Sequence, residues 1–297
     1  MLPPYITNQK LVEFISSALL EDVGTGDHTS LSTVSASQQG KAQLIFKDKG
    51  TIAGIAMAKK IFEVVDPTLK AEFFKEDGDS VNFGDIGLIV SGNVHAILKS
   101  ERLVLNCLQR MSGIATLTQQ YISAIKHTKA KLLDTRKTTP NFRLAEKWAV
   151  AIGGGHNHRY GLYDMILLKD NHIDFAGGVS QAIQASKKYL LDKQLDLKIE
   201  VEVRNLQELE LAMAEGGLYR IMLDNMSLLD MCSAVSMVGG KIPLEASGGV
   251  TLETIAAIAE TGVDYISVGA LTHSVKSMDI SLKACKQILH KHNFNDY

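Results

Sequence analysis

The second half of the chain alternates short apolar runs with amphipathic stretches. Each apolar run ends abruptly in polar residues, which is typical of buried strands in a parallel sheet. The predicted strands end near Thr135, Lys169, Glu202, Asp224, Ser247 and Gly269. Helical spacing of apolar residues fills most of the gaps, over residues 178–190, 206–215, 228–238 and 252–260. Repeated β–α alternation of this kind predicts an α/β fold with a closed or nearly closed barrel, in which chemistry gathers where strands end.

The N-terminal region follows a different pattern. Apolar positions in Asn8–Leu20 recur at helical spacing, with Asn8 as the expected N-cap. A polar loop over residues 21–30 follows, and it contains Asp27 and His28. We interpret these two residues as capping or turn residues, with a functional role as the alternative.

Between residues 41 and 98 the pattern indicates a small α+β layered domain. One helix is predicted over residues 56–65, and tight turns are predicted at Gly78-Asp79 and Gly84-Asp85. Short strands are predicted at AQLIFK, TIAGIA, AEFFKE, GLIVSG and VHAILK.

A long helical pattern is predicted to start at Ser100, which would be its N-cap, and to continue to Ile125. Arg102 would then lie in the first turn, where a cation opposes the helix dipole. The alternatives are an exposed surface arginine and an arginine that meets an anionic ligand or a partner chain.

Composition narrows the functional class. The chain has 297 residues, enough to bury a large core, and its formal net charge of −2 gives no general attraction to nucleic acid or membranes. Cys107, Cys232 and Cys285 are widely spaced without a CxxC pair, which argues against a disulfide framework or a zinc site. There is no signal-peptide pattern and no apolar run of membrane-spanning length. We therefore expect a cytoplasmic protein that binds neither nucleic acid nor membrane.

Basic residues gather between Leu132 and Asp174, near the ends of two predicted strands. Arg143, Lys147 and His156 lie within this stretch, and the residues expected to form one site are Arg136, Lys137, His158, Arg159 and Lys169. Cations at strand ends form a pocket for a ligand with several negative charges. The alternative is a solvated basic surface. The position of these cations at strand ends beside glycines, rather than along a helix face, favours the pocket.

Carboxylates end the next two predicted strands, at Glu202 and Asp224. Beside a cationic pocket they could hold Mg²⁺ bridged to a pyrophosphate, because Mg²⁺ prefers oxygen ligands and often binds through substrate phosphates. Glu200 points to the same side of its strand as Glu202 and competes for this role. The alternative for each acid is structural pairing with a neighbouring cation.

Glycines follow the last two predicted strands, in Ser247-Gly248-Gly249 and at Gly269. With a helix expected to begin at Thr251, their backbone N–H groups fit a phosphate cradle. Turn glycines are the alternative. The sequence has no GxGxxG after the first predicted strand, no P-loop lysine motif and no GxSxG elbow, so dinucleotide, ATP and serine-hydrolase chemistry are disfavoured.

A series of motifs covering almost the whole chain resembles the quinolinate phosphoribosyltransferase family, also called nicotinate-nucleotide pyrophosphorylase (carboxylating). In order, they are EDVGTGD, SERLVLNCLQRMSGIAT, DTRKTTPNFR, GGGHNHR, LLKDNHI, VEV, LDN, EASGGV and ISVGALTHS. The resemblance implies a glycosyltransferase of pyridine nucleotide and NAD biosynthesis. It would convert quinolinate and phosphoribosyl pyrophosphate, with Mg²⁺, to nicotinate mononucleotide, pyrophosphate and CO₂.

The resemblance also implies a domain organisation. An N-terminal α/β open sandwich over residues 1–115 would be joined to an incomplete, TIM-like barrel over residues 116–275. A C-terminal helix over residues 276–297 would pack back on the first domain. Family members are homodimers, sometimes assembled into hexamers, with the active site completed by the partner chain.

Matching motif by motif, the resemblance implies roles for individual residues. Quinolinate carboxylates would be held by Arg136, His158, Arg159 and Lys169, with Arg102 reaching in from the partner subunit. Lys137, Glu202 and Asp224 would be the catalytic residues facing the ribose and the Mg²⁺–pyrophosphate, with Glu202 and Asp224 as metal ligands. The 5′-phosphate would be surrounded by Ser247, Gly248, Gly269 and His273. His156 matches no role.

Other functions remain open at this point. One is a related phosphoribosyltransferase with another acceptor, and another is a barrel lyase that forms a Schiff base on Lys137 or Lys169. A different class is a non-catalytic sensor of phosphoribosyl ligands on the same fold.

Overall fold

The structure is a computed structural model of the chain, and it describes residues 3–285. The chain divides into two compact units, one of Met1–Ser112 with Ser277–Tyr297 and one of Gly113–Lys276. No helix within the described residues is long and apolar enough to cross a membrane.

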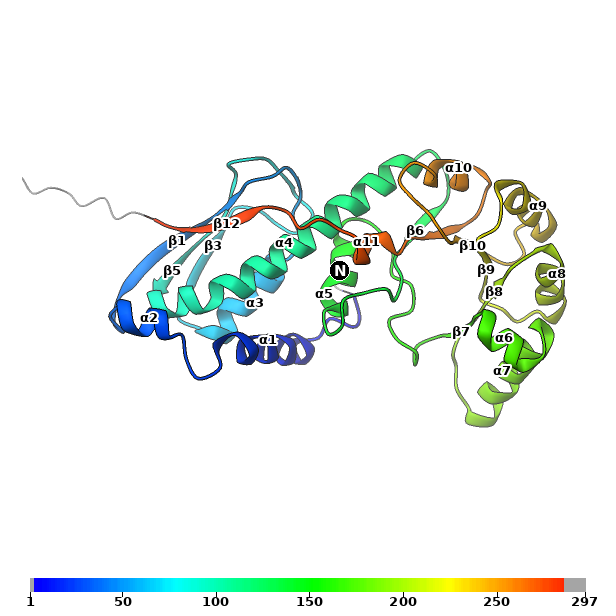
Figure 1. The fold of residues 1–297 in the computed structure, drawn as a ribbon, viewed down its shortest axis with the longest axis horizontal. Helices are drawn as coiled ribbons and strands as arrows, with labels where there is room; N and C mark the ends of the chain where they lie inside the picture. The colour runs from blue at the N-terminus through cyan, green and yellow to red at the C-terminus, as the bar shows by residue number, and fades with distance from the viewer. Residues whose placement is uncertain (1–2, 286–297) are drawn as a thin grey trace, which may run out of the picture. The chain divides into compact units, whose positions relative to one another are not determined.

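The first unit is built on a four-stranded antiparallel sheet with the strand order β12-β1-β5-β3 (Figure 1). Its strands are β1 (Gln39–Phe46), β3 (Lys70–Phe73), β5 (Ile86–Asn93) and β12 (Ile280–Ala284). A separate two-stranded ribbon consists of β2 (Gly50–Thr51) and β4 (Ser80–Val81). The helices are α1 (Asn8–Val23), α2 (His28–Thr33), α3 (Ile55–Val65) and the first part of α4 (Val94–Ile125). Alternate residues of β1 are buried and form the apolar face expected of such a sheet.

The predicted N-terminal helix is confirmed, but its cap is not. Helix α1 begins at Asn8, and the side chain of Thr7 accepts a hydrogen bond from Lys10 N at 3.3 Å. Asn8 as N-cap is therefore wrong by one residue. The capping role of Asp27 is confirmed, because its carboxylate accepts the Ser30 N–H at 3.0 Å at the start of α2.

The predicted strand VHAILK and the helix start at Ser100 are both wrong. Helix α4 already begins at Val94, and Asn93 Oδ1 accepts the Ala96 N–H at 3.3 Å. Ser100 is fully buried inside the helix, where its hydroxyl donates to Ile97 O at 2.8 Å. A short apolar run cannot be assigned to strand or helix by periodicity alone. Because Arg102 does not lie in the first turn, the helix dipole gives no argument for a ligand there.

The predicted strand TIAGIA is also largely wrong, since only Gly50–Thr51 is extended and paired. Gly54 has φ +108°, and α3 starts at Ile55. The Asp77 carboxylate accepts the N–H groups of Gly54 at 2.6 Å and Ile55 at 2.8 Å. The cap of α3 thus comes from a distant turn, which the local sequence pattern could not indicate.

The predicted C-terminal helix over residues 276–297 is wrong where it is described. Residues Ile280–Ala284 form β12, which pairs antiparallel with β1. The remainder of that predicted helix, residues 286–297, lies outside the described residues.

The second unit is a six-stranded parallel sheet with the order β6-β11-β10-β9-β8-β7 (Figure 1). Its strands are β6 (Lys131–Leu133), β7 (Ile166–Leu168), β8 (Ile199–Val203), β9 (Arg220–Asp224), β10 (Leu244–Ser247) and β11 (Tyr265–Ser267). The helices that follow β6 and β7 are α5 (Arg143–Ile152), α6 (Asp170–Ala176) and α7 (Val179–Lys193). The later helices are α8 (Leu206–Glu215), α9 (Leu228–Val238), α10 (Ile255–Glu260) and α11 (Ala270–His273).

In this sheet β6 and β7 are the two edges, and no ladder joins them within the described residues. The sheet is therefore an incomplete barrel. The α/β class is confirmed, with an antiparallel sheet in the first unit and parallel β–α alternation in the second. Parallel strands place their carboxyl ends at one edge, so this unit brings the predicted polar residues together.

Candidate active site

A cavity of about 840 Å³ lies at the carboxyl ends of the parallel strands. Its lining includes every predicted site residue of the second unit: Arg136, Lys137, His158, Arg159, Lys169, Glu202, Asp224, Ser247, Gly248, Gly269 and His273. Arg102 is not among its lining residues and is exposed on α4 in the first unit. The sequence pattern did not single out Thr135, Asn225 or Ser267, which also line the cavity.

Two arginines from different segments meet in this cavity. Arg136 follows β6, and Arg159 lies in the loop after α5, where its Nη1 donates to Met165 O at 3.1 Å. Burial, and then the nearby Arg136 charge, lower the pKa of Arg159. The Nε atom of Arg136 is buried without a hydrogen-bond partner in the described structure. Like charges held together beside an unsatisfied donor form a site that an anion would stabilise.

His158 is buried at the side of the cavity, and both of its ring nitrogens face protein atoms. Nδ1 accepts the Arg159 N–H at 2.8 Å, and Nε2 lies 3.2 Å from Glu200 Oε2. Burial lowers the pKa of His158, which favours the neutral form of the ring. The residue lines the cavity, and its Nε2 is buried without a hydrogen-bond partner among the described residues.

The two predicted carboxylates take different environments. Glu202 is 7% exposed, and its Oε1 lies 2.6 Å from Lys169 Nζ. Asp224 is half-buried and accepts a hydrogen bond from Asn225 Nδ2 at 3.0 Å. Both line the cavity, and the structural pairing considered for each acid is thus present for Glu202.

Glu200 is fully buried and does not line the cavity. It belongs to an inner cluster with His158, Arg220 and Glu245, in which Arg220 Nη1 is hydrogen-bonded to Glu245. Burial, and then the charge of Glu200, raise the pKa of Glu245 to about 7. Glu200 therefore competes poorly with Glu202 for a ligand in the cavity, although both side chains point to the same side of β8.

The glycines after β10 and β11 are required by the shape of the cavity. Gly248 has φ +100°, and a Cβ there would lie 2.1 Å from Asn225 Oδ1. A Cβ on Gly269 would lie 3.0 Å from both Lys137 Cδ and His273 Cδ2. These positions let backbone and basic side chains approach one another closely.

The expected helix start at Thr251 is wrong. Helix α10 begins at Ile255, with Thr254 as its cap residue, and Thr251 N donates to Thr254 Oγ1 at 2.9 Å in a preceding turn. Support for an anion cradle therefore rests on the loop after β10 and on Gly269, not on a helix N-terminus.

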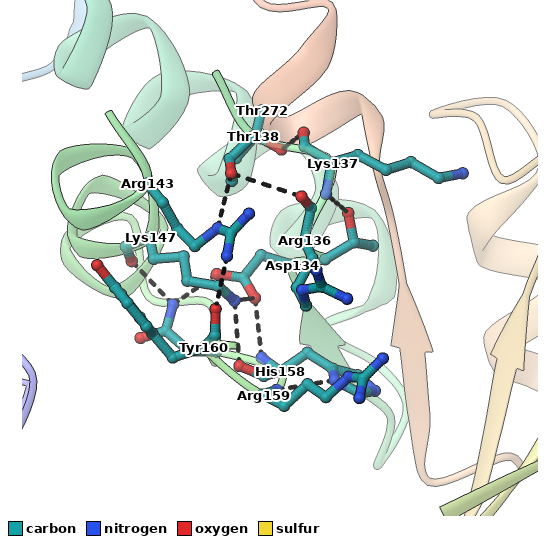
Figure 2. A network of polar contacts seen from close by, with 12 residues as sticks. Asp134, Arg136, Lys137, Thr138, Arg143, Lys147, His158, Arg159, Tyr160 and Thr272 are labelled. Carbon is teal, nitrogen blue, oxygen red and sulfur yellow. Dashed lines mark hydrogen bonds and ion pairs between the residues drawn. The ribbon is translucent and has the colours of Figure 1, made fainter. Parts of the chain in front are cut away.

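The backbone around the arginines is held by a polar network (Figure 2). Arg143 bridges two loops, with its Nε donating to Thr138 Oγ1 at 2.9 Å and its Nη1 to Tyr160 O at 3.1 Å. Thr272 Oγ1 donates to Lys137 O at 2.7 Å. The run of three glycines at residues 153–155 allows close packing against α4 and does not line the cavity. A Cβ on Gly153 would lie 2.8 Å from Ala115 O on α4.

The fold and the cavity together define a class of protein, an α/β barrel whose strand ends surround a cavity lined by basic side chains, two carboxylates and glycines. The family described as quinolinate phosphoribosyl transferase, C-terminal domain, matches residues 114–283. The family described as quinolinate phosphoribosyl transferase, N-terminal domain, matches residues 27–112. The chain belongs to the quinolinate phosphoribosyltransferase family.

Individual relatives agree with this assignment. The chain is 47% identical over 296 residues to the chloroplastic nicotinate-nucleotide pyrophosphorylase (carboxylating) of Arabidopsis thaliana, covering 95% of this chain and 84% of the relative. The mitochondrial quinolinate phosphoribosyltransferase (decarboxylating) 2b of Nicotiana tabacum gives the same identity and coverage. The structure of the nicotinate-nucleotide pyrophosphorylase from Francisella tularensis is similar, with a TM-score of 0.87 and 40% identity, covering 94% of this chain and 98% of that one.

Proposed function

We propose that this enzyme transfers the phosphoribosyl group of phosphoribosyl pyrophosphate to quinolinate, with loss of CO₂, to give nicotinate mononucleotide and pyrophosphate. This is the nicotinate-nucleotide diphosphorylase (carboxylating) activity of NAD biosynthesis, and family membership over nearly the whole chain supports it. Within the site, the main support for this proposal is the pair of neighbouring arginines Arg136 and Arg159. Arg136 Nε is buried and has no hydrogen-bond partner among the described residues.

These cations explain a preference for two carboxylates. Arg136 and Arg159 each present a planar donor fork that suits a carboxylate, and Lys169 adds a third positive charge beside them. A monocarboxylate such as nicotinate would leave part of the half-buried positive charge of Arg136 and Arg159 unpaired, which weakens its binding. His158 shapes the wall of this pocket, and we assign it no direct bond to the substrate.

Glu202 and Asp224 suit a divalent metal. They supply carboxylate oxygens from neighbouring strands, the donors that Mg²⁺ prefers, and both face the cavity. We propose them as the residues that hold Mg²⁺, either directly or through water. Bound there with the substrate, Mg²⁺ would neutralise charge on the pyrophosphate.

The reaction needs charge stabilisation more than acid–base chemistry. Cleavage of the bond between ribose C1 and pyrophosphate leaves an oxocarbenium-like centre and a more negative leaving group. Lys137 lines the cavity, and we assign it the role of stabilising the leaving group, with Glu202 or Asp224 stabilising the cationic ribose. The unprotonated pyridine nitrogen forms the new bond to C1, so the arginines must hold it near that carbon.

Loss of CO₂ follows from the product of that step. The pyridinium nitrogen draws the electron pair left at C2 when the C2–carboxylate bond breaks, and a proton from solvent completes nicotinate mononucleotide. The 5′-phosphate would lie against Ser247, Gly248, Gly269 and His273, where close backbone approach is possible.

We propose a homodimer, which could assemble further into a hexamer, with Arg102 of one subunit completing the quinolinate pocket of its partner. The exposure of Arg102 on α4 is compatible with such a contact. We also retain the cytoplasm as the expected location. The organellar names of two plant relatives show that the family works in more than one compartment.

The proposed function is tested by incubating the full chain with phosphoribosyl pyrophosphate and Mg²⁺, and with quinolinate or nicotinate as acceptor. We expect CO₂ and nicotinate mononucleotide from quinolinate alone, with turnover abolished by EDTA and restored by excess Mg²⁺. Turnover of nicotinate without CO₂ would overturn the dicarboxylate pocket. Binding of phosphoribosyl pyrophosphate without turnover of either acceptor would overturn the enzymatic assignment.

A further inference from the structure

A fully buried ion pair lies behind the cavity and takes no part in the chemistry described above. Asp134 follows β6 and Lys147 lies in α5, and neither side chain has any exposed surface. Lys147 Nζ donates to Asp134 Oδ1 at 2.5 Å. Neither residue lines the cavity. Taking two charges out of water is unfavourable, so such a pair is weak evidence for stability and calls for another explanation.

The pair holds the backbone of one residue at both of its polar groups. His158 N donates to Asp134 Oδ1 at 2.8 Å, and Lys147 Nζ donates to His158 O at 3.0 Å (Figure 2). Asn157 completes the network, because its Nδ2 donates to Asp134 Oδ2 at 2.6 Å and to Lys147 O at 2.8 Å. Residues 157 and 158 are thereby fixed by side chains rather than by a regular strand.

The same segment is joined to β6 just before the network. His156 N donates to Leu132 O at 2.9 Å, and Asp134 N donates to His156 O at 3.1 Å, which forms a short parallel bridge. His156 itself is exposed, and its backbone supplies this contact. The loop after α5 therefore extends the edge of the sheet beside β6.

Each end of the network leads directly to one of the cavity arginines. Arg136 is two residues beyond Asp134, and Arg159 is the residue after His158. We propose that Asp134 and Lys147 form a positioning pair that sets the spacing of Arg136 and Arg159, and thereby the fit of a substrate with two carboxylates. The inference rests on the proposed function of the same cavity.

This role predicts a selective defect. A change in the spacing of two arginines weakens a ligand that needs both, whereas phosphoribosyl pyrophosphate is assigned above to the separate loops after β10 and β11, which line another part of the cavity. The KM for quinolinate should rise while the KM for phosphoribosyl pyrophosphate stays nearly constant. A purely structural role would lower the amount of folded enzyme and leave both KM values unchanged.

The decisive variant removes both charges together, Asp134→Asn with Lys147→Met, because removal of one partner would leave a buried charge unpaired. We expect the double variant to fold with a Tm close to that of the wild type. Its KM for quinolinate should rise at least about 10-fold, with a change of less than about 2-fold for phosphoribosyl pyrophosphate, since charge-assisted positioning is lost. An unchanged quinolinate KM, or an equal rise in both KM values, would overturn the proposal.

Two further variants keep the test decisive. Asn157→Ala removes the amide that joins Asp134 to the loop while leaving both charges, and it should show the same selective rise, about 3-fold or more. If the double variant does not fold, equal KM values in Asn157→Ala and the wild type would overturn the proposal.

Leu209→Ala in α8 is the control for a general loss of stability, because Leu209 is fully buried and does not line the cavity. Wild-type turnover of quinolinate in the same assay separates failure of this inference from failure of the proposed function.

Discussion

Lys169 Nζ lies 2.6 Å from Glu202 Oε1, so a cation of the proposed quinolinate pocket is bonded to a carboxylate of the proposed metal site. The two residues come from the ends of adjacent parallel strands, β7 and β8. The pair therefore connects the region assigned to the acceptor with the region assigned to the pyrophosphate.

Replacement of Lys169 should affect catalysis far more than stability. The Lys169 side chain is 46% exposed, and the Glu202 side chain, although only 9% exposed, lines the open cavity, where water can replace the lost partner, so the pair contributes little to folding. We expect Lys169→Met to lower kcat/KM for quinolinate by about 10-fold or more, since a substrate carboxylate loses a charged partner. Its Tm should stay within about 2 °C of the wild type. Steady-state kinetics with thermal unfolding checks this, and a large fall in Tm with unchanged kinetics would contradict it.

Arg136 offers a sharper test of the acceptor pocket. Its buried Nε has no partner among the described residues, so truncation should not disrupt the fold. We expect Arg136→Ala to raise the KM for quinolinate about 10- to 100-fold, and Arg136→Lys to recover only part of the loss because lysine lacks the planar fork. Arg204→Ala is the control, since Arg204 is partly exposed and pairs with Glu208 away from the cavity. Near-normal kinetics in Arg136→Ala would show that Arg136 does not bind quinolinate.

Periodicity was sufficient to predict the β–α alternation and the cavity. Helices Leu206–Glu215 and Leu228–Val238 begin and end at the predicted residues, because short amphipathic helices between buried strands have an unambiguous pattern. Once the strands are parallel, their polar ends must meet, and this is why residues as far apart as Arg136 and Asp224 were grouped correctly.

Long-range partners were beyond the reach of the same reasoning. In the sequence Lys147 is only one of the basic residues between Leu132 and Asp174, and its full burial and its contact with Asp134 appear only in the structure. The cap of α3 is likewise supplied by Asp77, from a turn more than twenty residues away. The start of α4 was misplaced because the apolar run before Ser100 suits either a strand or a helix.

Gly248 should be needed for binding of phosphoribosyl pyrophosphate. Its φ of +100° strains any other residue, and a Cβ would collide with Asn225 Oδ1 in the cavity wall. We expect Gly248→Ala to raise the KM for phosphoribosyl pyrophosphate by about 10-fold or more, because overpacking shifts the loop after β10. Gly239→Ala is the matched control, with φ +56° but no atom closer than 3.9 Å to the added Cβ. Equal KM values in the two variants would mean that the loop does not bind this substrate.

The inner cluster predicts a pH dependence of stability. Glu245 faces Glu200, His158 and Arg220, and its pKa is raised to about 7 from an ordinary value of 4.5. The folded state therefore binds this proton more tightly than the unfolded state. The stability contributed by the protonated group is fully present below pH 4.5 and is lost as the pH rises to about 7, a change on the order of 3 kcal/mol.

Chemical denaturation of wild type and Glu245→Gln between pH 4.5 and 8 isolates this contribution. Glutamine cannot ionise, so the free energy of unfolding of the variant, relative to wild type, should increase with pH and level off above about pH 7. Glu253→Gln is the control, because hydrogen bonds lower the pKa of that exposed carboxyl, so its contribution to stability changes only below about pH 4.5 and its difference from wild type should be flat across this range. A difference between Glu245→Gln and wild type that is flat across this range would show that Glu245 is already ionised in the folded protein at the acid end.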